Sequence, residues 1–190
     1  TAVTFSIASI IDRAGNPVST ISNTSDASSV TFDYTAPQLD VVTSSSNNSL
    51  TSSRAKADDV VTVSFTTNEE VQTPVVLIAG ESAVEANANG DKATWAATKT
   101  MDAEDSDGAI AFTINFTDLA GNTGTEVTQS GITSGSAVTF DNTAPTLASL
   151  TVASSNSTNS NYGIEDDIIS LTILAAEDLQ GDASKNPYGI

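Results

Sequence analysis

Apolar and polar residues alternate with a period of two along several short stretches of the chain. Val61, Val63 and Phe65 are separated by Thr and Ser, and the stretches 112–117 and 169–173 show the same alternation. This is the period of a β-strand with one buried and one solvated face. Shorter apolar runs predict further strands at 30–32, 75–78, 93–99 and 138–140. No stretch keeps the period of an amphipathic helix, so the pattern predicts an all-β fold.

Residues that favour turns fill the gaps between these apolar runs. The stretches Asn-Ala-Asn-Gly-Asp at 87–91 and Glu-Asp-Ser-Asp-Gly at 104–108 predict hairpin turns, because Asn, Asp and Gly tolerate the backbone angles that tight turns need. We expect about seven strands between Thr35 and Asn142. That number and the spacing of the turns are typical of a β-sandwich.

The chain contains an internal repeat. Residues 30–65 align without a gap to residues 138–173, with 15 identities over 36 positions and a constant offset of 108. Upstream, Asp-Arg-Ala-Gly-Asn at 12–16 matches Asp-Leu-Ala-Gly-Asn at 118–122, at an offset of 106. A period of about 100 residues is too long for a solenoid unit and has the size of one sandwich domain.

The repeat sets the predicted domain boundaries. We expect residues 35–142 to form one complete Ig-like β-sandwich of Greek-key type. Residues 1–34 are then the C-terminal strands of a preceding copy, and residues 143–190 the N-terminal strands of a following copy. Because a hairpin alone is marginally stable in water, both end segments are expected to need a partner. That partner is either a neighbouring repeat of the same chain or strands shared with an adjacent chain.

Charge and composition exclude several functions. The chain carries 24 acidic and 6 basic residues, a formal net charge of −18, so nucleic-acid binding and adhesion to anionic lipid are not expected. It contains neither His nor Cys, which excludes a His-dependent nucleophile, a His or Cys zinc site and disulfides. We find no apolar run long enough for a membrane span and no leader peptide in this stretch.

The motifs resemble a known family. The order Asp-x-Ala-Gly-Asn, Val-Thr-Phe-Asp-x-Thr-Ala-Pro and Asp-Asp-Val-Val-Thr-Val-Ser-Phe is similar to the Ig-like tandem repeats of large bacterial and archaeal cell-surface proteins. These include type I-secreted adhesins, surface fibres and surface-layer proteins. The resemblance implies an extracellular, non-enzymatic spacer or stalk whose partners are neighbouring repeats, surface glycans, or host or biofilm ligands. Related surface repeats often bind Ca²⁺ between domains, so it also implies calcium as a cofactor.

Acidic residues gather at the predicted domain ends. Asp33 ends the last strand of a repeat, so we expect it to meet a loop of the following repeat. Asp118 is expected at the other pole of its own domain, beside the junction that precedes that domain. Clustered carboxylates on short loops suit Ca²⁺, which takes six to eight oxygen ligands. The alternative interpretation is that these acids are solvated turn residues. The candidate ligands are Asp12, Asp33, Asp58, Asp59, Glu69, Asp118, Asp141, Asp166 and Asp167.

Three weaker interpretations stay open. Asn23, Asn47, Asn115 and Asn156 each begin a sequon for N-glycosylation. A filament assembled by strand exchange between chains would explain the incomplete end segments. A carbohydrate-binding or glycoside-hydrolysing module would need exposed aromatics or a pair of carboxylates in a cleft. We expect the single Trp95 to lie in the core instead, and the acidic stretch 102–107 to be a solvated loop.

Overall fold

The computed structural model describes residues 2–177 and 179. The described residues form β-strands and one short 3₁₀ turn, Gln129–Gly131, with no α-helix among them. By its internal contacts the chain divides between Asn142 and Thr143 into two compact units. Each unit is described by itself below. No helix in the described part of the chain has the length and apolar character needed to cross a bilayer.

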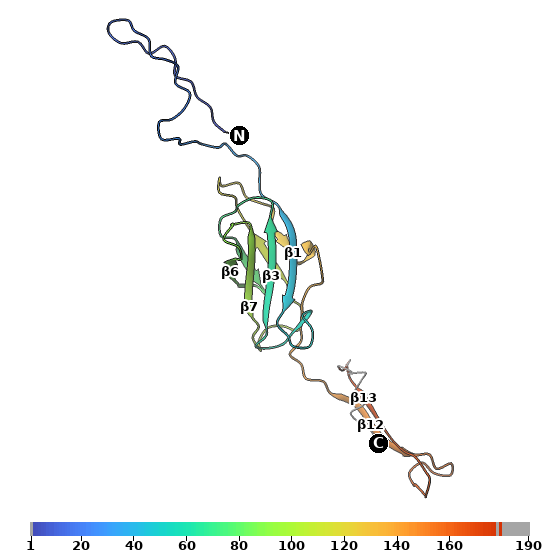
Figure 1. Ribbon diagram of the computed structural model, residues 1–190. Coiled ribbons are helices and arrows are strands. Elements are labelled where there is room, and N and C mark those ends of the chain that lie inside the picture. The colour runs from blue at the N-terminus through green and yellow to red at the C-terminus, as the bar shows by residue number, and fades with distance from the viewer. Residues whose placement is uncertain (1, 178, 180–190) are drawn as a thin grey trace. The chain divides into compact units, whose positions relative to one another are not determined.

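The first sheet of the first unit has the order β1-β3-β7-β6, and all its neighbouring strands are antiparallel (Figure 1). Its central pair forms because β3 places Val and Phe on one face and Ser and Thr on the other. The turn at 87–91 joins the paired strands β6 and β7, which confirms the predicted hairpin there. The strands are β1 (Leu39–Ser46), β3 (Val60–Thr67), β6 (Val84–Asn87) and β7 (Thr94–Thr100).

The second sheet has the order β10-β9-β4-β5 and is also antiparallel. Its strands are β4 (Val75–Ile78), β5 (Glu81–Ser82), β9 (Phe112–Asn115) and β10 (Val127–Thr128). A third, small sheet joins β2 (Arg54–Ala55), β11 (Thr139–Phe140) and β8 (Gly108–Ala109). The all-β prediction is therefore confirmed, and several packed sheets are the arrangement of a β-sandwich.

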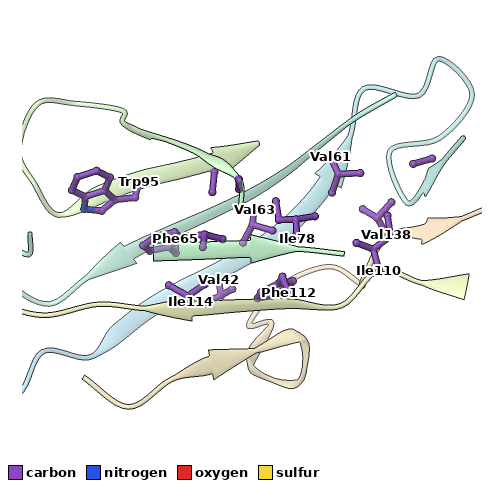
Figure 2. Packing of buried hydrophobic residues seen from close by; sticks show 14 of the residues in the cluster. Val42, Val61, Val63, Phe65, Ile78, Trp95, Ile110, Phe112, Ile114 and Val138 are labelled. Carbon is purple, nitrogen blue, oxygen red and sulfur yellow. The ribbon is translucent and has the colours of Figure 1, made fainter. Parts of the chain in front are cut away.

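The two four-stranded sheets bury their apolar faces against each other. Figure 2 shows Val63 and Phe65 of β3 among Ile78 of β4 and Phe112 and Ile114 of β9. Each of these five side chains is 3% exposed or less. Trp95 of β7 belongs to the same cluster, as the sequence predicts, and its indole N–H donates to the Lys92 carbonyl at 3.1 Å.

Two sequence predictions need correction. The stretch 104–108 is not a hairpin turn, because it connects β7 to β8, which lie in different sheets. The structure also divides residues 35–142 into eleven strands rather than about seven. Five of these are two-residue strands, and all of them except β11, which falls in the predicted stretch 138–140, are too short for the pattern to reveal.

Residues 2–34 contain isolated bridges rather than extended strands. The bridges pair Ala2 with Thr31, Ile7 with Ile21, and Ile11 with Pro17. Within residues 35–142, positions at offsets of 106 to 108 pair in a similar way: Ala109 with Thr139, Ile114 with Val127, and Thr117 with Thr123. The two segments thus share their sequence and their local pairing.

The second unit contains one antiparallel hairpin, formed by β12 (Leu147–Ser154) and β13 (Ile169–Ala175). Its register equals that of β1 and β3 at every position when 108 is added to each residue number, including the irregularity after the first pair. The end of the predicted third domain, residues 178 and 180–190, lies outside the described residues.

Candidate metal-binding site

Three carboxylates from distant parts of the first unit converge. Asp33, Glu69 and Asp118 each offer an oxygen, and these three oxygens all lie within 4.8 Å of one another. Asp33 precedes β1, Glu69 follows β3, and Asp118 follows β9. Among the residues that the structure describes, this is the only such group of three acidic side chains. We refer to it as the acidic triad.

Asp118 is held by its own loop. The backbone N–H groups of Gly121 and Asn122 donate to Asp118 Oδ1 at 2.7 and 2.8 Å, and Asn122 Nδ2 donates to Oδ2 at 2.7 Å. Gly121 has φ +100°, a backbone region that favours glycine. Asp118 is 1% exposed, and its burial acts to raise its pKa. The hydrogen bonds from Asn122 and Gly121 outweigh burial and lower the pKa, so Asp118 is a fixed anion.

Glu69 is affected in the opposite direction. Burial raises its pKa, and the neighbouring negative charges of Asp33 and Asp118 raise it further. The turn that carries it is fixed by Thr67, whose hydroxyl donates to the Glu69 carbonyl at 2.6 Å. The raised pKa of Glu69 reflects its burial and the repulsion among the three carboxylates. A cation bound between the three carboxylates would offset this repulsion.

Asp33 is linked to Asp118 through Asn122. The Asn122 Nδ2 group that donates to Asp118 also donates to the Asp33 carbonyl at 3.3 Å. Asp33 Oδ1 accepts from the Thr35 N–H at 2.9 Å. Sequence reasoning placed Asp33 and Asp118 beside one junction but missed Asn122 as the residue that connects them. The signal that could have identified Asn122 is its recurrence as Asn16 in the upstream copy of the motif.

The arrangement suits a hard divalent cation. Three carboxylates provide oxygens from three separate chain segments, and the closely spaced negative charges attract a cation electrostatically. Ca²⁺ tolerates irregular geometry and varied coordination, whereas Mg²⁺ demands a near-ideal octahedron. The remaining Ca²⁺ ligands would come from backbone carbonyls and water.

Asp12 occupies the same kind of loop as Asp118. Its Oδ1 accepts from the N–H groups of Ala14 and Asn16 at 2.8 and 2.9 Å, and its Oδ2 accepts from Asn16 Nδ2 at 2.8 Å. The Asn16 side chain is the main cause that lowers the Asp12 pKa. The loop geometry is thus retained, but Asp12 is exposed and joins no acidic group among the described residues.

Other predicted ligands lie away from the triad. Asp58 and Asp59 precede β3, whereas Glu69 follows it, so these candidates lie at opposite ends of that strand. Asp59 Oδ2 accepts from Asn48 Nδ2 at 2.7 Å and from the Lys56 N–H at 2.9 Å. In the second unit, Asp167 Oδ2 accepts from the Ile164 N–H at 2.8 Å. Both carboxylates therefore stabilise turns.

Asp141 and Asp166 also have local roles. Asp141 Oδ2 lies 3.9 Å from Arg54 Nη1, and the Asp141 N–H donates to the Ala55 carbonyl at 2.9 Å. Asp166 has φ +71°, as its counterpart Asp58 has φ +72°. The two positions thus share a strained turn conformation, which Asp adopts more readily than most residues.

The remaining candidates differ in accessibility. Of the sequon residues, Asn23, Asn47 and Asn115 are exposed and Asn156 is half-buried. In the acidic loop 102–107, Asp105 Oδ2 accepts from Lys99 Nζ at 2.6 Å and from the Asp102 N–H at 2.8 Å. This loop is therefore closed by a largely buried ion pair rather than fully solvated.

Comparison of the chain with family models, curated proteins and solved structures finds no match.

Proposed function

We propose that this chain is a non-enzymatic structural segment of a large extracellular surface protein, built from Ig-like β-sandwiches in tandem. We further propose that Ca²⁺ bound by the acidic triad stiffens the junction before residues 35–142. The observation that carries the proposal is the convergence of Asp33, which precedes the sandwich, with Glu69 and Asp118 of the sandwich itself.

The position of the triad gives calcium a mechanical role. Between Asp33 and β1 the chain runs through Thr35-Ala36-Pro37. Proline fixes its own φ and restricts the residue before it to extended geometry. A cation that held Asp33 against Glu69 and Asp118 would remove most of the remaining freedom of this short linker. At a free Ca²⁺ of ten times the Kd, binding would stabilise the folded state by about 1.4 kcal/mol.

Two further observations support a tandem arrangement. The β12–β13 hairpin has the register of β1 and β3, and residues 2–34 have the bridges of residues 109–139. Extracellular modules bind Ca²⁺ with a Kd of about 10⁻⁴–10⁻³ M. Such a site is loaded in calcium-rich extracellular fluid and empty in cytosol, which fits a protein that stiffens after export to the cell surface.

A filament formed by strand exchange is the second candidate. The exposed apolar residues of both end segments favour it, among them Phe5, Val30, Leu150 and Leu171. We prefer the tandem array because the β12–β13 hairpin repeats the register of β1 and β3 on the same chain.

A carbohydrate-binding role is less well supported. Sugar-binding sites stack the sugar ring on an accessible aromatic side chain. Trp95 is only 6% exposed, and its indole N–H already donates to a backbone carbonyl. Tyr34 and Tyr162 are exposed, and Tyr34 makes an edge-to-face contact with the partly exposed Phe32, but exposed rings alone do not make a sugar-binding site.

Calcium titration of the chain with the variant Asp33→Asn tests the proposal. We expect the parent to bind one Ca²⁺ per triad by calorimetry, and the variant to bind at least about tenfold more weakly, because it loses one anionic ligand. Hydrogen exchange at residues 33–38 should slow on calcium addition in the parent alone.

The matched control is Asp40→Asn, an exposed residue of β1 outside the triad. It removes the same charge and should leave calcium affinity within about twofold. Equal weakening in both variants would mean that calcium responds to net charge rather than to this site. Absence of calcium binding by the parent at several millimolar would overturn the calcium part of the proposal.

A further inference from the structure

The β12–β13 hairpin exposes a continuous apolar face. Directly opposed pairs join Leu150 to Ile173 and Val152 to Leu171, and directly opposed residues of an antiparallel pair lie on the same face. Ile169 lies on this face as well, because it is separated from Leu171 by one residue. The five side chains are 38% to 67% exposed. Ser and Thr dominate the opposite face.

The aligned residues of the first unit show what such a face packs against. Leu150, Ile169, Leu171 and Ile173 correspond to Val42, Val61, Val63 and Phe65 at the offset of 108. Those four are 2% exposed or less. They pack in one core cluster with Val76 and Ile78 of β4 and with Phe112 and Ile114 of β9 (Figure 2).

We propose that the β12–β13 face is the docking surface for a sheet of the β10–β9–β4 type, which closes it into a further sandwich. The occupant is identified by its chemistry: strands that alternate Val, Ile or Phe with Thr or Asn, as β4 and β9 do. The inference rests on the tandem-sandwich part of the proposed function. It does not depend on calcium.

The side chains of the β12–β13 face differ in size from the aligned side chains of β1 and β3, and a docked sheet must accommodate this difference. Leu150, Val152, Ile169 and Leu171 are larger than Val42, Ser44, Val61 and Val63, whereas Ile173 is smaller than Phe65. The smaller Ile173 offsets part of the added volume, and cores tolerate combined apolar substitutions when the pattern is kept and the total volume changes little. The face therefore retains the apolar pattern that a β10–β9–β4 sheet needs.

The test extends the chain itself. Because Ala175 aligns with Thr67, residues 176–190 are replaced by a second copy of residues 68–142, which contains β4 to β11. We expect the backbone amides of β13 to exchange at least about 10³-fold more slowly in the extended chain. In a completed sandwich these amides become accessible to solvent only when the whole domain unfolds. The experiment is run in EDTA, so that its failure and a failure of the calcium site are distinguishable.

Two variants of the extended chain make the result specific. Leu171→Asp places a charge on the docking face and should abolish the slow exchange, whereas Thr172→Asp, on the opposite face, should retain it. A third chain carries Leu150→Val, Val152→Ser, Ile169→Val, Leu171→Val and Ile173→Phe, which restores all five aligned side chains of the first unit.

Each alternative result overturns the proposal. Fast exchange in the extended chain combined with slow exchange in the restored chain would show that the hairpin's own side chains do not fit such a sheet. Fast exchange in the restored chain as well would show that the hairpin is not the first half of a sandwich. Slow, concentration-dependent exchange in the unextended chain would make a second copy the occupant.

Discussion

At the scale of single residues, Asp118 and Glu69 of the triad affect the pH dependence of stability in opposite directions. Asp118 has a lowered pKa because hydrogen bonds from its loop outweigh its burial, whereas the pKa of Glu69 is raised by burial and by its two acidic neighbours. A carboxyl with a lowered pKa stabilises the fold above its ordinary pKa, and one with a raised pKa stabilises it below. The triad therefore combines a permanent anion with one that resists ionisation.

Glu69→Gln should change the pH dependence of stability. The folded state holds the Glu69 proton more tightly than the unfolded state does, so this residue's stabilisation is complete below its ordinary pKa of 4.5 and is lost as pH rises through the raised value. In EDTA, the variant should lose less stability than the parent between pH 4.5 and 7. Urea unfolding across this range measures the difference. Parallel pH profiles for variant and parent would contradict the assignment.

The same residue should make calcium binding depend on pH. Glu69 must release its proton to become a ligand, so acidification competes with the metal. We expect calcium affinity of the parent to fall as pH drops below the raised pKa of Glu69, and the weaker binding of Glu69→Gln to vary less with pH. Calorimetry at three pH values between 4.5 and 7 would detect this. An equally steep pH dependence in both proteins would argue against Glu69 as a ligand.

Lys99 offers a second test at this scale. Its ammonium group lies 2.6 Å from Asp105 Oδ2, and both side chains are largely buried. Removing one partner of a buried pair leaves the other uncompensated, so Lys99→Met should destabilise the chain by roughly 1–3 kcal/mol. Lys56→Met, at an exposed lysine, is the control and should change stability by less than about 0.5 kcal/mol. Equal effects in urea unfolding would show that Lys99 acts only through net charge.

At the scale of elements, alternation predicts the long strands because each has one face in the core and one in water. The burial of β3 follows the predicted alternation from Val60 to Thr67. Of the two-residue strands only β11 is predicted, from the pair Val138 and Phe140, because two residues by themselves carry no period. The sequence also predicts at which end of a strand each carboxylate lies. It does not predict which strand ends come together in the fold. Asp58 and Glu69 flank the same strand, yet only Glu69 reaches the triad, since tertiary packing decides which loops share a pole.

Within β4 the two faces should respond differently to truncation. Ile78 is fully buried in the core, whereas Val75, three residues earlier on the same strand, is 59% exposed. Ile78→Ala should cost about 2–5 kcal/mol because it removes buried methylene and methyl groups and leaves a cavity. Val75→Ala should cost less than about 1 kcal/mol. Urea unfolding of both variants checks the assignment of faces, and a larger loss at Val75 would contradict it.

At the scale of the whole molecule, the dominant property is the excess of negative charge. With 24 acidic and 6 basic residues, most carboxylates have no cationic partner, and repulsion among them opposes the compact state. Three ion pairs within 4.0 Å are present in the described part of the chain, and two of them share Lys99. Such a molecule is stabilised by any added cation through screening, and additionally by a cation that binds a specific site.

These two contributions can be separated by comparing salts at equal ionic strength. Raising NaCl from about 0.02 to 0.2 M shortens the screening length from roughly 20 to 7 Å, so the Tm of the parent and of Asp33→Asn should rise together. Calcium chloride at a few millimolar adds little screening, so any further rise in Tm reports binding. We expect that rise in the parent and not in Asp33→Asn, and a smaller one with magnesium chloride, because the triad does not impose an octahedron. Identical melting curves in calcium and magnesium at matched ionic strength would reduce the effect of calcium to charge screening, whereas a calcium-specific rise confined to the parent would locate it at the junction before the sandwich.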